Sequence, residues 1–293
     1  MGKDVMIKLN HVQKKYPDFS MDCSLTVYPG MITGLIGANG EGKSTIFKLI
    51  LGLIGKEAGE MEVLGKKREC SNEGKQPEKE ILQQTGVVLA ETGFGSRFTI
   101  HDIIPFLEDL YPEFEKDKFL QYCEKYKLPM NKKIKEFSTG MKRKLQIFAA
   151  ITHKAKLLLL DEPTSGLDVV AREQMLTLLR EYMETEGRAI LISSHLSGDL
   201  ETFCDDIYLI QKGTITFHEE MDRLLDAYGL LKVSDEVYKK MDKSHIICRK
   251  KENFGWSCLT DQKAYYQMHN PEIVIEKGSV DELILLMAGG ERI

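Results

Sequence analysis

The sequence predicts an α/β protein built around a largely parallel sheet. Strand-like and helix-like segments alternate over the first two-thirds of the chain, which is the pattern of repeated strand–helix–strand units. Two apolar runs, at residues 157–160 and 189–195, are typical of strands buried on both faces of such a sheet. A third run, MITGLI, leads directly into the glycine-rich stretch GANGEGKST. Together these features favour a doubly covered sheet that carries a site at one strand end.

The chain has 293 residues, of which 42% are apolar and 29% charged, as in ordinary globular proteins. No uninterrupted apolar stretch approaches the roughly 18 residues that a membrane span needs, and the start MGKDVMIKLN lacks the apolar core of a secretion signal. We therefore expect any work at a membrane to be done through a partner. Six scattered cysteines without metal spacing indicate packing residues in a reducing cytosol.

The net charge of -5 argues against nucleic acid as a partner, because no global basic field is present. One locally basic cluster is interpreted as a solvated face. It consists of Lys132, Lys133, Lys135, Lys142, Arg143 and Lys144.

The elements follow in order along the chain. After MITGLI, the spacing of Ile46, Leu49, Ile50 and Leu53 predicts the buried stripe of a helix. Residues 55–90 carry short strand-like pieces, GEMEVLGK and TGVVLA, and residues 101–136 are helical in character. A helix with the stripe Met175, Leu178, Leu179 and Tyr182 lies between the strand at 157–160 and the strand at 189–195.

After about residue 228 the pattern changes to a smaller mixed segment. SHIICRK and PEIVIEK resemble strands, and the single tryptophan, Trp256, falls in the turn-like FGWSC. Ser279 with Glu282 three residues later predicts a capped helix start. We therefore expect two domains, residues 1–228 and 229–293, with a helical subdomain at about 101–150 in the first.

The stretch Gly37–Ser44 fits the pattern G-x-x-x-x-G-K-[ST] between a strand and a helix. Glycines let backbone N–H groups approach phosphate oxygens, and a helix N-terminus adds partial positive charge. Lys43 is expected to reach the β- and γ-phosphates, and Ser44 to place its hydroxyl on Mg²⁺.

A metal-bound triphosphate also needs an acid at the end of a neighbouring strand, and LLLLDE supplies two. We expect Asp161 to hold Mg²⁺ and Glu162 to polarise the attacking water. Two acids after an apolar run are ordinarily a plain strand terminus. Beside the phosphate-binding loop, the functional interpretation is favoured.

Residues 137–143, FSTGMKR, place Ser138 and Gly140 at the start of a basic helical stretch. A plain helix cap is the ordinary role of such a serine. However, the ordered motifs GANGEGKST, STGM, LLLLDEPTSGLD and ISSH resemble those of the ATPase subunits of ABC transporters over residues 5–228. The resemblance implies a P-loop ABC-type ATPase domain with β and helical subdomains, followed by a small mixed α/β extension.

The resemblance also implies that two copies meet head to tail around two Mg-ATP. Ser138 and Gly140 are then expected to contact the γ-phosphate of the opposite subunit, Asp168 to link the two sites, and His195 to reach the γ-phosphate and water. Tyr16 matches the aromatic residue on which adenine stacks. The expected ATP-binding residues are Tyr16, Gly37, Asn39, Gly40, Gly42, Lys43, Ser44 and Thr45.

The chain departs from the family pattern at two places. Thr139 and Met141 make the signature S-T-G-M, where the family has S-G-G-Q. The family's glutamine loop should fall near residues 88–92, where the chain has no glutamine and Ala90 occupies the expected place. Glu91 is the nearest polar residue, and we expect it to take over part of the magnesium role because carboxylates bind Mg²⁺ well.

These expectations favour an ATP-hydrolysing subunit that drives export of an unknown substrate through a separate membrane permease. The chain would then be cytoplasmic and peripheral on the inner face of the cell membrane. Exposed aromatics around Phe94, Arg97, Phe98 and the helix from His101 are the candidate dock for a permease helix. The alternatives are a soluble ABC ATPase acting on nucleic acid or ribosomes, and a nucleotide-binding regulator without hydrolysis. The chain shows neither cysteine pairs nor a second ATPase half, which argues against the first alternative. Glu162 and His195 argue against the second.

Overall fold

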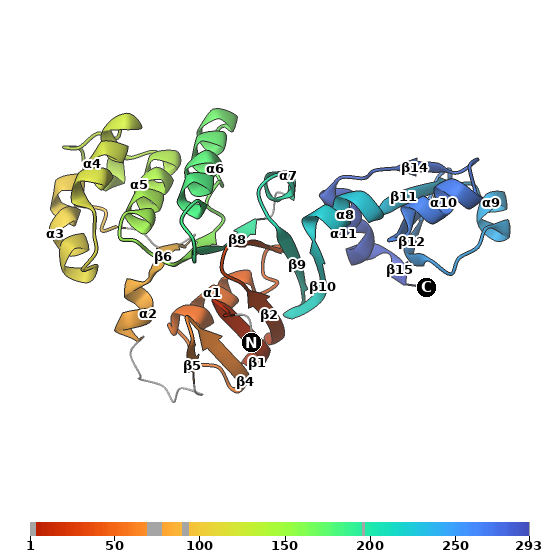
Figure 1. The fold of residues 1–293 in the computed structure, drawn as a ribbon, viewed down its shortest axis with the longest axis horizontal. Coiled ribbons are helices and arrows are strands. Elements are labelled where there is room, and N and C mark those ends of the chain that lie inside the picture. The colour runs from red at the N-terminus through yellow and green to blue at the C-terminus, as the bar shows by residue number, and fades with distance from the viewer. Residues whose placement is uncertain (1–3, 69–77, 90–93, 195–196, 293) are drawn as a thin grey trace. The chain divides into compact units, whose positions relative to one another are not determined.

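The computed structural model describes residues 4–68, 78–89, 94–194 and 197–292. It contains two compact units, which are coloured along the chain in Figure 1. The first comprises residues 1–195 and 210–216, and the second comprises residues 196–209 and 217–293. Residues 217–228 thus lie in the second unit. The expected boundary between domains 1–228 and 229–293 stays a prediction.

The centre of the first unit is a parallel sheet in the strand order β3-β8-β7-β6. All residues of β3, β7 and β8 are buried, because the apolar runs of the sequence form these strands. The expectation of a parallel sheet with doubly buried strands is confirmed. The strands are β3 (Ile32–Ile36), β6 (Thr85–Val88), β7 (Leu157–Asp161) and β8 (Ala189–Ser194).

An antiparallel group in the order β5-β4-β1-β2 carries the N-terminal hairpin. Tyr16 pairs with Phe19 at the end of this hairpin, on either side of a two-residue turn. Thr214, at the start of β10, pairs in parallel with Asp22 of β2. The strands are β1 (Ile7–Tyr16), β2 (Phe19–Val27), β4 (Ala58–Val63), β5 (Lys66–Arg68), β9 (Asp206–Gln211) and β10 (Thr214–Glu220).

The helix after the glycine-rich loop, α1 (Lys43–Leu51), buries Ile46, Leu49 and Ile50 as the periodicity predicts. It ends at Gly52, whose φ of 72° is a left-handed conformation that glycine adopts at low cost. Leu53 therefore lies beyond the helix and is 52% exposed, so its assignment to the buried stripe is wrong.

Helices α3 to α6 follow the predicted order, and the stripe of α6 is buried at all four expected positions. Helix α2 lies within residues 55–90, where only strand-like pieces were expected. The basic cluster is solvated in part only. Arg143 is 8% exposed and donates to the carbonyl of Leu89, so its placement on a solvated face is wrong. The helices are α2 (Lys79–Gln83), α3 (Ile100–Leu110), α4 (Lys116–Lys125), the 3₁₀ helix η1 (Ile134–Glu136), α5 (Thr139–Ile151) and α6 (Val169–Met183).

The second unit contains an antiparallel sheet in the order β14-β11-β13-β12-β15. The two strand-like segments and the capping box of Ser279 and Glu282 are confirmed. Trp256 lies in β13 and not in a turn, because the turn closes two residues earlier and the ring stacks on Tyr238. The elements are α7 (Ser197–Glu201), α8 (Met221–Ala227), β11 (Gly229–Val233), α9 (Asp235–Lys240), β12 (Ile246–Glu252), β13 (Gly255–Thr260), α10 (Lys263–His269), β14 (Val274–Glu276), α11 (Val280–Gly289) and β15 (Glu291–Arg292).

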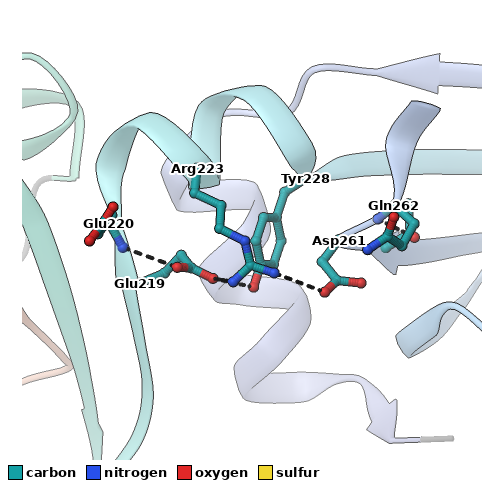
Figure 2. Close-up of polar contacts among 7 residues, drawn as sticks. Glu219, Glu220, Arg223, Tyr228, Asp261 and Gln262 are labelled. Atoms are coloured by element: carbon teal, nitrogen blue, oxygen red, sulfur yellow. Dashed lines mark hydrogen bonds and ion pairs between the residues drawn. The ribbon is translucent and has the colours of Figure 1, made fainter. Parts of the chain in front are cut away.

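A polar network in the second unit joins the end of β10 to the end of β13 (Figure 2). Glu219 accepts from Arg223 Nη1 at 2.5 Å and from the Tyr228 hydroxyl at 2.9 Å, while Arg223 Nη2 donates to Asp261 at 3.3 Å. Burial, and then the hydrogen bond to Glu219, raises the pKa of Tyr228. The network therefore holds α8 against the C-terminal sheet.

No helix of the described residues is long and apolar enough to cross a membrane.

Candidate active site

The glycine-rich loop connects β3 to α1 and forms one wall of a cavity of about 280 Å³. Gly42 precedes the helix with a φ of 110°, a conformation that side chains rarely adopt. No side chain caps the start of α1, so its first backbone N–H groups are available to a ligand. The cavity is lined by Tyr16, Phe19, Asn39, Gly40, Gly42, Lys43, Ser44, Thr45, Asp161 and Glu162.

Lys43 is 6% exposed and bonds to the loop itself. Its Nζ donates to the carbonyl of Gly37 at 2.6 Å and to that of Ala38 at 3.1 Å. Burial lowers the pKa of Lys43, whereas the charges of Glu162 and Asp161 raise it. The ammonium group is thus inside the loop and facing two carboxylates, ready to exchange carbonyl oxygens for phosphate oxygens.

Asp161 ends β7 and is 3% exposed. Its Oδ2 accepts from Ser44 Oγ at 2.7 Å, and its Oδ1 accepts from Ser193 Oγ at 2.5 Å. A hydroxyl and a carboxylate are hard oxygen donors, so this pair fits Mg²⁺. Within the described ranges no group of three or more His, Cys, Asp or Glu could hold a metal alone, so phosphate and water oxygens would have to complete the coordination.

Glu162 has a φ of 52°, a left-handed conformation that costs about 1–3 kcal/mol for a residue other than glycine. Its N–H donates to both the carbonyl (3.2 Å) and the hydroxyl (3.1 Å) of Ser193, which hold this backbone in place. The strained turn directs Glu162 into the cavity that contains Lys43. The sequence therefore places both acids correctly beside the loop.

The outer end of the cavity carries two aromatic rings. Tyr16 is 42% exposed and its ring centroid lies 6.4 Å from that of Phe19. Lys14 Nζ lies 5.7 Å from the Tyr16 ring centroid. An exposed ring at the mouth of a phosphate-binding cavity is placed to stack on a planar base.

Ser138, Gly140 and Asp168 are not among the residues that line this cavity. Ser138 is the N-cap of α5 and accepts from Met141 N at 3.2 Å, and Asp168 caps α6 by accepting from Ala171 N at 2.8 Å. A Cβ on Gly140 would lie 3.1 Å from Leu167 Cδ2, so the starts of α5 and α6 pack closely. The single chain therefore does not bring Ser138 to this cavity, and its contact with a nucleotide stays a prediction.

His195 and Glu91, together with Ala90, lie outside the described residues, so their expected roles stay predictions. The sequence reasoning missed Ser193, Phe19 and Arg143. Ser193 is brought to Asp161 by the register between β7 and β8, which the sequence pattern does not show. Arg143 is buried near Asp161 and Glu162. Burial lowers the pKa of its guanidinium group, and the charges of the two acids oppose this lowering. Nothing in the spacing distinguished it from the surrounding lysines.

Comparison with known proteins identifies relatives of this chain. The family described as ABC transporter matches residues 20–165. The ATP-binding protein YtrB of Bacillus subtilis is 30% identical over 225 residues, which cover 76% of this chain and 75% of that protein. The bacitracin transport ATP-binding protein BcrA of Bacillus licheniformis is 31% identical, covering 75% and 71%. The lantibiotic transport ATP-binding protein SrtF of Streptococcus pyogenes is 29% identical, covering 74% and 92%.

Solved structures have the same fold. An ATP-binding subunit of an ABC transporter superimposes with a TM-score of 0.65 at 23% identity, covering 75% of this chain and 91% of that one. A dimeric cassette in a post-hydrolysis state with ADP and phosphate gives a TM-score of 0.63 at 20% identity, covering 74% and 99%. The predicted α/β fold of a P-loop ATPase cassette is confirmed.

Proposed function

The chain belongs to the ABC transporter family of ATP-binding proteins, and from this premise we propose that it powers a transporter whose membrane-spanning part is a separate polypeptide. As a member of this family the chain is an ATPase. The observation that supports the proposed site best is the convergence of Lys43, Asp161 and Glu162 on one cavity at the start of α1.

In the proposed reaction, Lys43 and the N–H groups at the start of α1 hold the β- and γ-phosphates. Glu162 accepts a proton from water, whose oxygen attacks the γ-phosphorus while the bond to the bridging oxygen breaks and ADP departs. Bound Mg²⁺, held by Ser44 and Asp161, would neutralise charge on the phosphates. Tyr16 would stack on adenine at the outer end of the cavity.

We propose that a second, identical subunit completes the site. Ser138 and Gly140 lie outside the cavity of their own chain and at the exposed start of a helix without acidic residues in its first turn. That start can meet the γ-phosphate held by the partner subunit, with Asp168 forming the link between the two sites. His195 would assist at the γ-phosphate, and Glu91 would replace the family glutamine.

The permease would dock on an apolar patch of the helical subdomain. This α3 patch consists of Phe98, Phe106 and Leu110, which are 40%, 60% and 46% exposed. The rings of Phe98 and Phe106 lie 5.5 Å apart, so they form one surface. The patch includes the predicted Phe98 and extends along the helix from His101, and it offers the aromatic anchors that grip a partner helix.

The relatives named for bacitracin and lantibiotic transport favour export of an antimicrobial or peptide-like compound. The chain would then be held at the cytoplasmic face of the membrane by its permease.

The replacement Glu162→Gln tests the catalytic proposal. It should abolish hydrolysis by at least about 100-fold, while ATP and Mg²⁺ convert the protein to a stable dimer, because binding is retained and cleavage is lost. Turnover and the mass from light scattering are the measurements. Glu186→Gln, an exposed acid on the same unit, should change neither. A Glu162→Gln protein that hydrolyses at the normal rate, or a wild type that is fully active as a strict monomer, contradicts the proposal.

The replacement Phe106→Ser tests the docking proposal. It should abolish co-purification with a hydrophobic membrane chain while ATP hydrolysis by the isolated protein persists. Phe254→Ser in the second unit, where the ring is 53% exposed, is the matched control and should leave co-purification intact. Undiminished co-purification of the Phe106→Ser protein would exclude the α3 patch as the dock.

A further inference from the structure

The phosphate-binding loop contains an acid, Glu41, directly before Gly42 and Lys43. A carboxylate at this place should oppose the binding of polyphosphate by charge repulsion, since like charges a few ångströms apart interact unfavourably. Glu41 also lies close enough to Lys43 for its charge to contribute to the pKa of that residue. The sequence gives no reason for tolerating an acid here.

The structure shows that the Glu41 side chain binds to another part of the first unit. Its Oε2 accepts a hydrogen bond from the backbone N–H of Lys212, and its backbone carbonyl accepts from Gly213 N at 3.1 Å. Lys212 and Gly213 form the two-residue turn between β9 and β10. Glu41 therefore joins the phosphate-binding loop to this turn by both its side chain and its main chain.

The turn has a conformation that needs support. Lys212 has a φ of 48° and Gly213 a φ of 79°, so both residues are left-handed, and this conformation costs a lysine about 1 kcal/mol. The turn is fixed against β2, because Gly213 O accepts from Asp22 N at 3.0 Å and a Cβ on Gly213 would lie 2.2 Å from the carbonyl oxygen of Ser20. The turn that binds Glu41 is thus anchored to β2.

Ile210, two residues before the turn, also lies against the loop. A Cβ on Gly37 would lie 2.6 Å from Ile210 O and 2.7 Å from Ile210 Cγ2, and a Cβ on Gly42 would lie 3.4 Å from Ile210 Cδ1. The segment 210–213 therefore supports the loop at Gly37, Glu41 and Gly42. Gly37 leaves no room for a side chain against Ile210, whereas Gly42 is crowded by Phe19 Cζ, which a Cβ would approach to 2.9 Å.

We propose that Glu41 is a positioning residue, which fixes the shape of the phosphate-binding loop by tying it to the Lys212–Gly213 turn. The carboxylate acts as a hydrogen-bond acceptor of the right length, and its charge is incidental to this role. The inference rests on the proposed ATP site. It concerns how that site is shaped and not the chemistry that occurs there.

Two conservative variants of the full-length protein separate length from charge. Glu41→Gln keeps the length and the acceptor oxygen but removes the charge, whereas Glu41→Asp keeps the charge but cannot reach Lys212 N. Losing one hydrogen bond that holds the loop in its binding shape corresponds to about tenfold in the affinity for ATP. Glu41→Asp should therefore raise the KM for ATP about tenfold with kcat changed less than about twofold, and Glu41→Gln should keep the KM within about twofold of wild type.

Amide hydrogen exchange in the peptide 206–216 without nucleotide is the second measurement. Exchange should accelerate by about tenfold in Glu41→Asp and remain slow in Glu41→Gln, because only the first loses the bond to Lys212 N. Lys212→Gly retains the backbone donor and suits the left-handed φ, so it should match wild type in both KM and exchange.

The proposal is overturned if Glu41→Asp behaves like wild type, or if Glu41→Gln lowers the KM, since charge repulsion would then be the effect of this residue. If the wild type does not hydrolyse ATP, the proposed function fails. The exchange measurement still decides whether Glu41 holds the turn, and equal exchange in the Asp and Gln variants would reject the inference on its own.

Discussion

Helices α1 and α5 both begin without an acidic residue in the first turn, but their N-termini are capped differently. The start of α1 follows Gly42 and has no side-chain cap, whereas the hydroxyl of Ser138 caps α5. Helices α3 and α11 carry reciprocal capping boxes with an acid in the first turn. Neither α1 nor α5 has such an acid within its own first turn to compensate the positive end of the helix.

The difference between α1 and α5 indicates that the two helix starts have different roles. At α1 the backbone N–H groups, Lys43 and two acids lie around one cavity, so most of a phosphate site exists within one chain. At α5 the serine hydroxyl accepts one bond from its own helix and keeps its O–H as a donor for a ligand. The start of α5 lies outside this cavity, and its contact with a nucleotide held by a second molecule stays a prediction.

The largest expected effect comes from breaking the α1 side of this comparison. Lys43→Ala should reduce hydrolysis by at least about 100-fold and weaken ATP binding, because the cavity loses its buried cation. Steady-state turnover and the binding of a fluorescent ATP analogue measure the two effects. Lys48→Ala, an exposed lysine on the same helix, should leave both unchanged. Intact turnover in Lys43→Ala would remove the basis of the site.

The α5 side gives a smaller and more selective effect. Ser138→Ala should cost about 1 kcal/mol of stability through loss of the cap and should lower hydrolysis about tenfold. Ser138→Asn restores a good cap, so stability should recover while hydrolysis stays low, since the proposed contact with a partner's phosphate needs the small hydroxyl. Denaturant unfolding and turnover are measured together. Recovery of both by Ser138→Asn would show that the serine is only a helix cap.

The same contrast explains what could be predicted from the sequence. The α1 site follows from local patterns, since Gly42, Lys43 and Ser44 are adjacent and Asp161 ends an obvious strand. Ser193 depends on the register between β7 and β8, which pairs it with Asp161, and register is a property of the assembled sheet.

Two wrong assignments have the same origin. Arg143 looks like one more lysine-type residue in a basic run, yet tertiary packing buries it against the carbonyl of Leu89. Leu53 continues a helical spacing, but the left-handed Gly52 ends the helix before it. Spacing describes one element at a time and does not show where an element ends or which neighbour covers it.

The smallest expected effect concerns the far end of α5. His153 follows this helix, is 2% exposed, stacks on Tyr111 with ring centroids 3.8 Å apart, and has Nδ1 2.9 Å from Ala149 O. Burial lowers the pKa of His153 below its ordinary value of 6.5, although its backbone hydrogen bonds oppose this. The folded protein therefore favours the neutral ring.

The sign of the pH dependence follows from that preference. The unfolded chain binds the proton first as pH falls, so the stabilisation by neutral His153 is complete above pH 6.5 and is lost progressively below it. Each unit by which the pKa is lowered corresponds to about 1.4 kcal/mol. Denaturant unfolding of wild type should therefore lose more free energy between pH 7.5 and 5 than that of His153→Gln, which keeps a donor for Ala149 O but does not titrate. Parallel losses of free energy in the two proteins would mean that the acid sensitivity arises from groups other than His153.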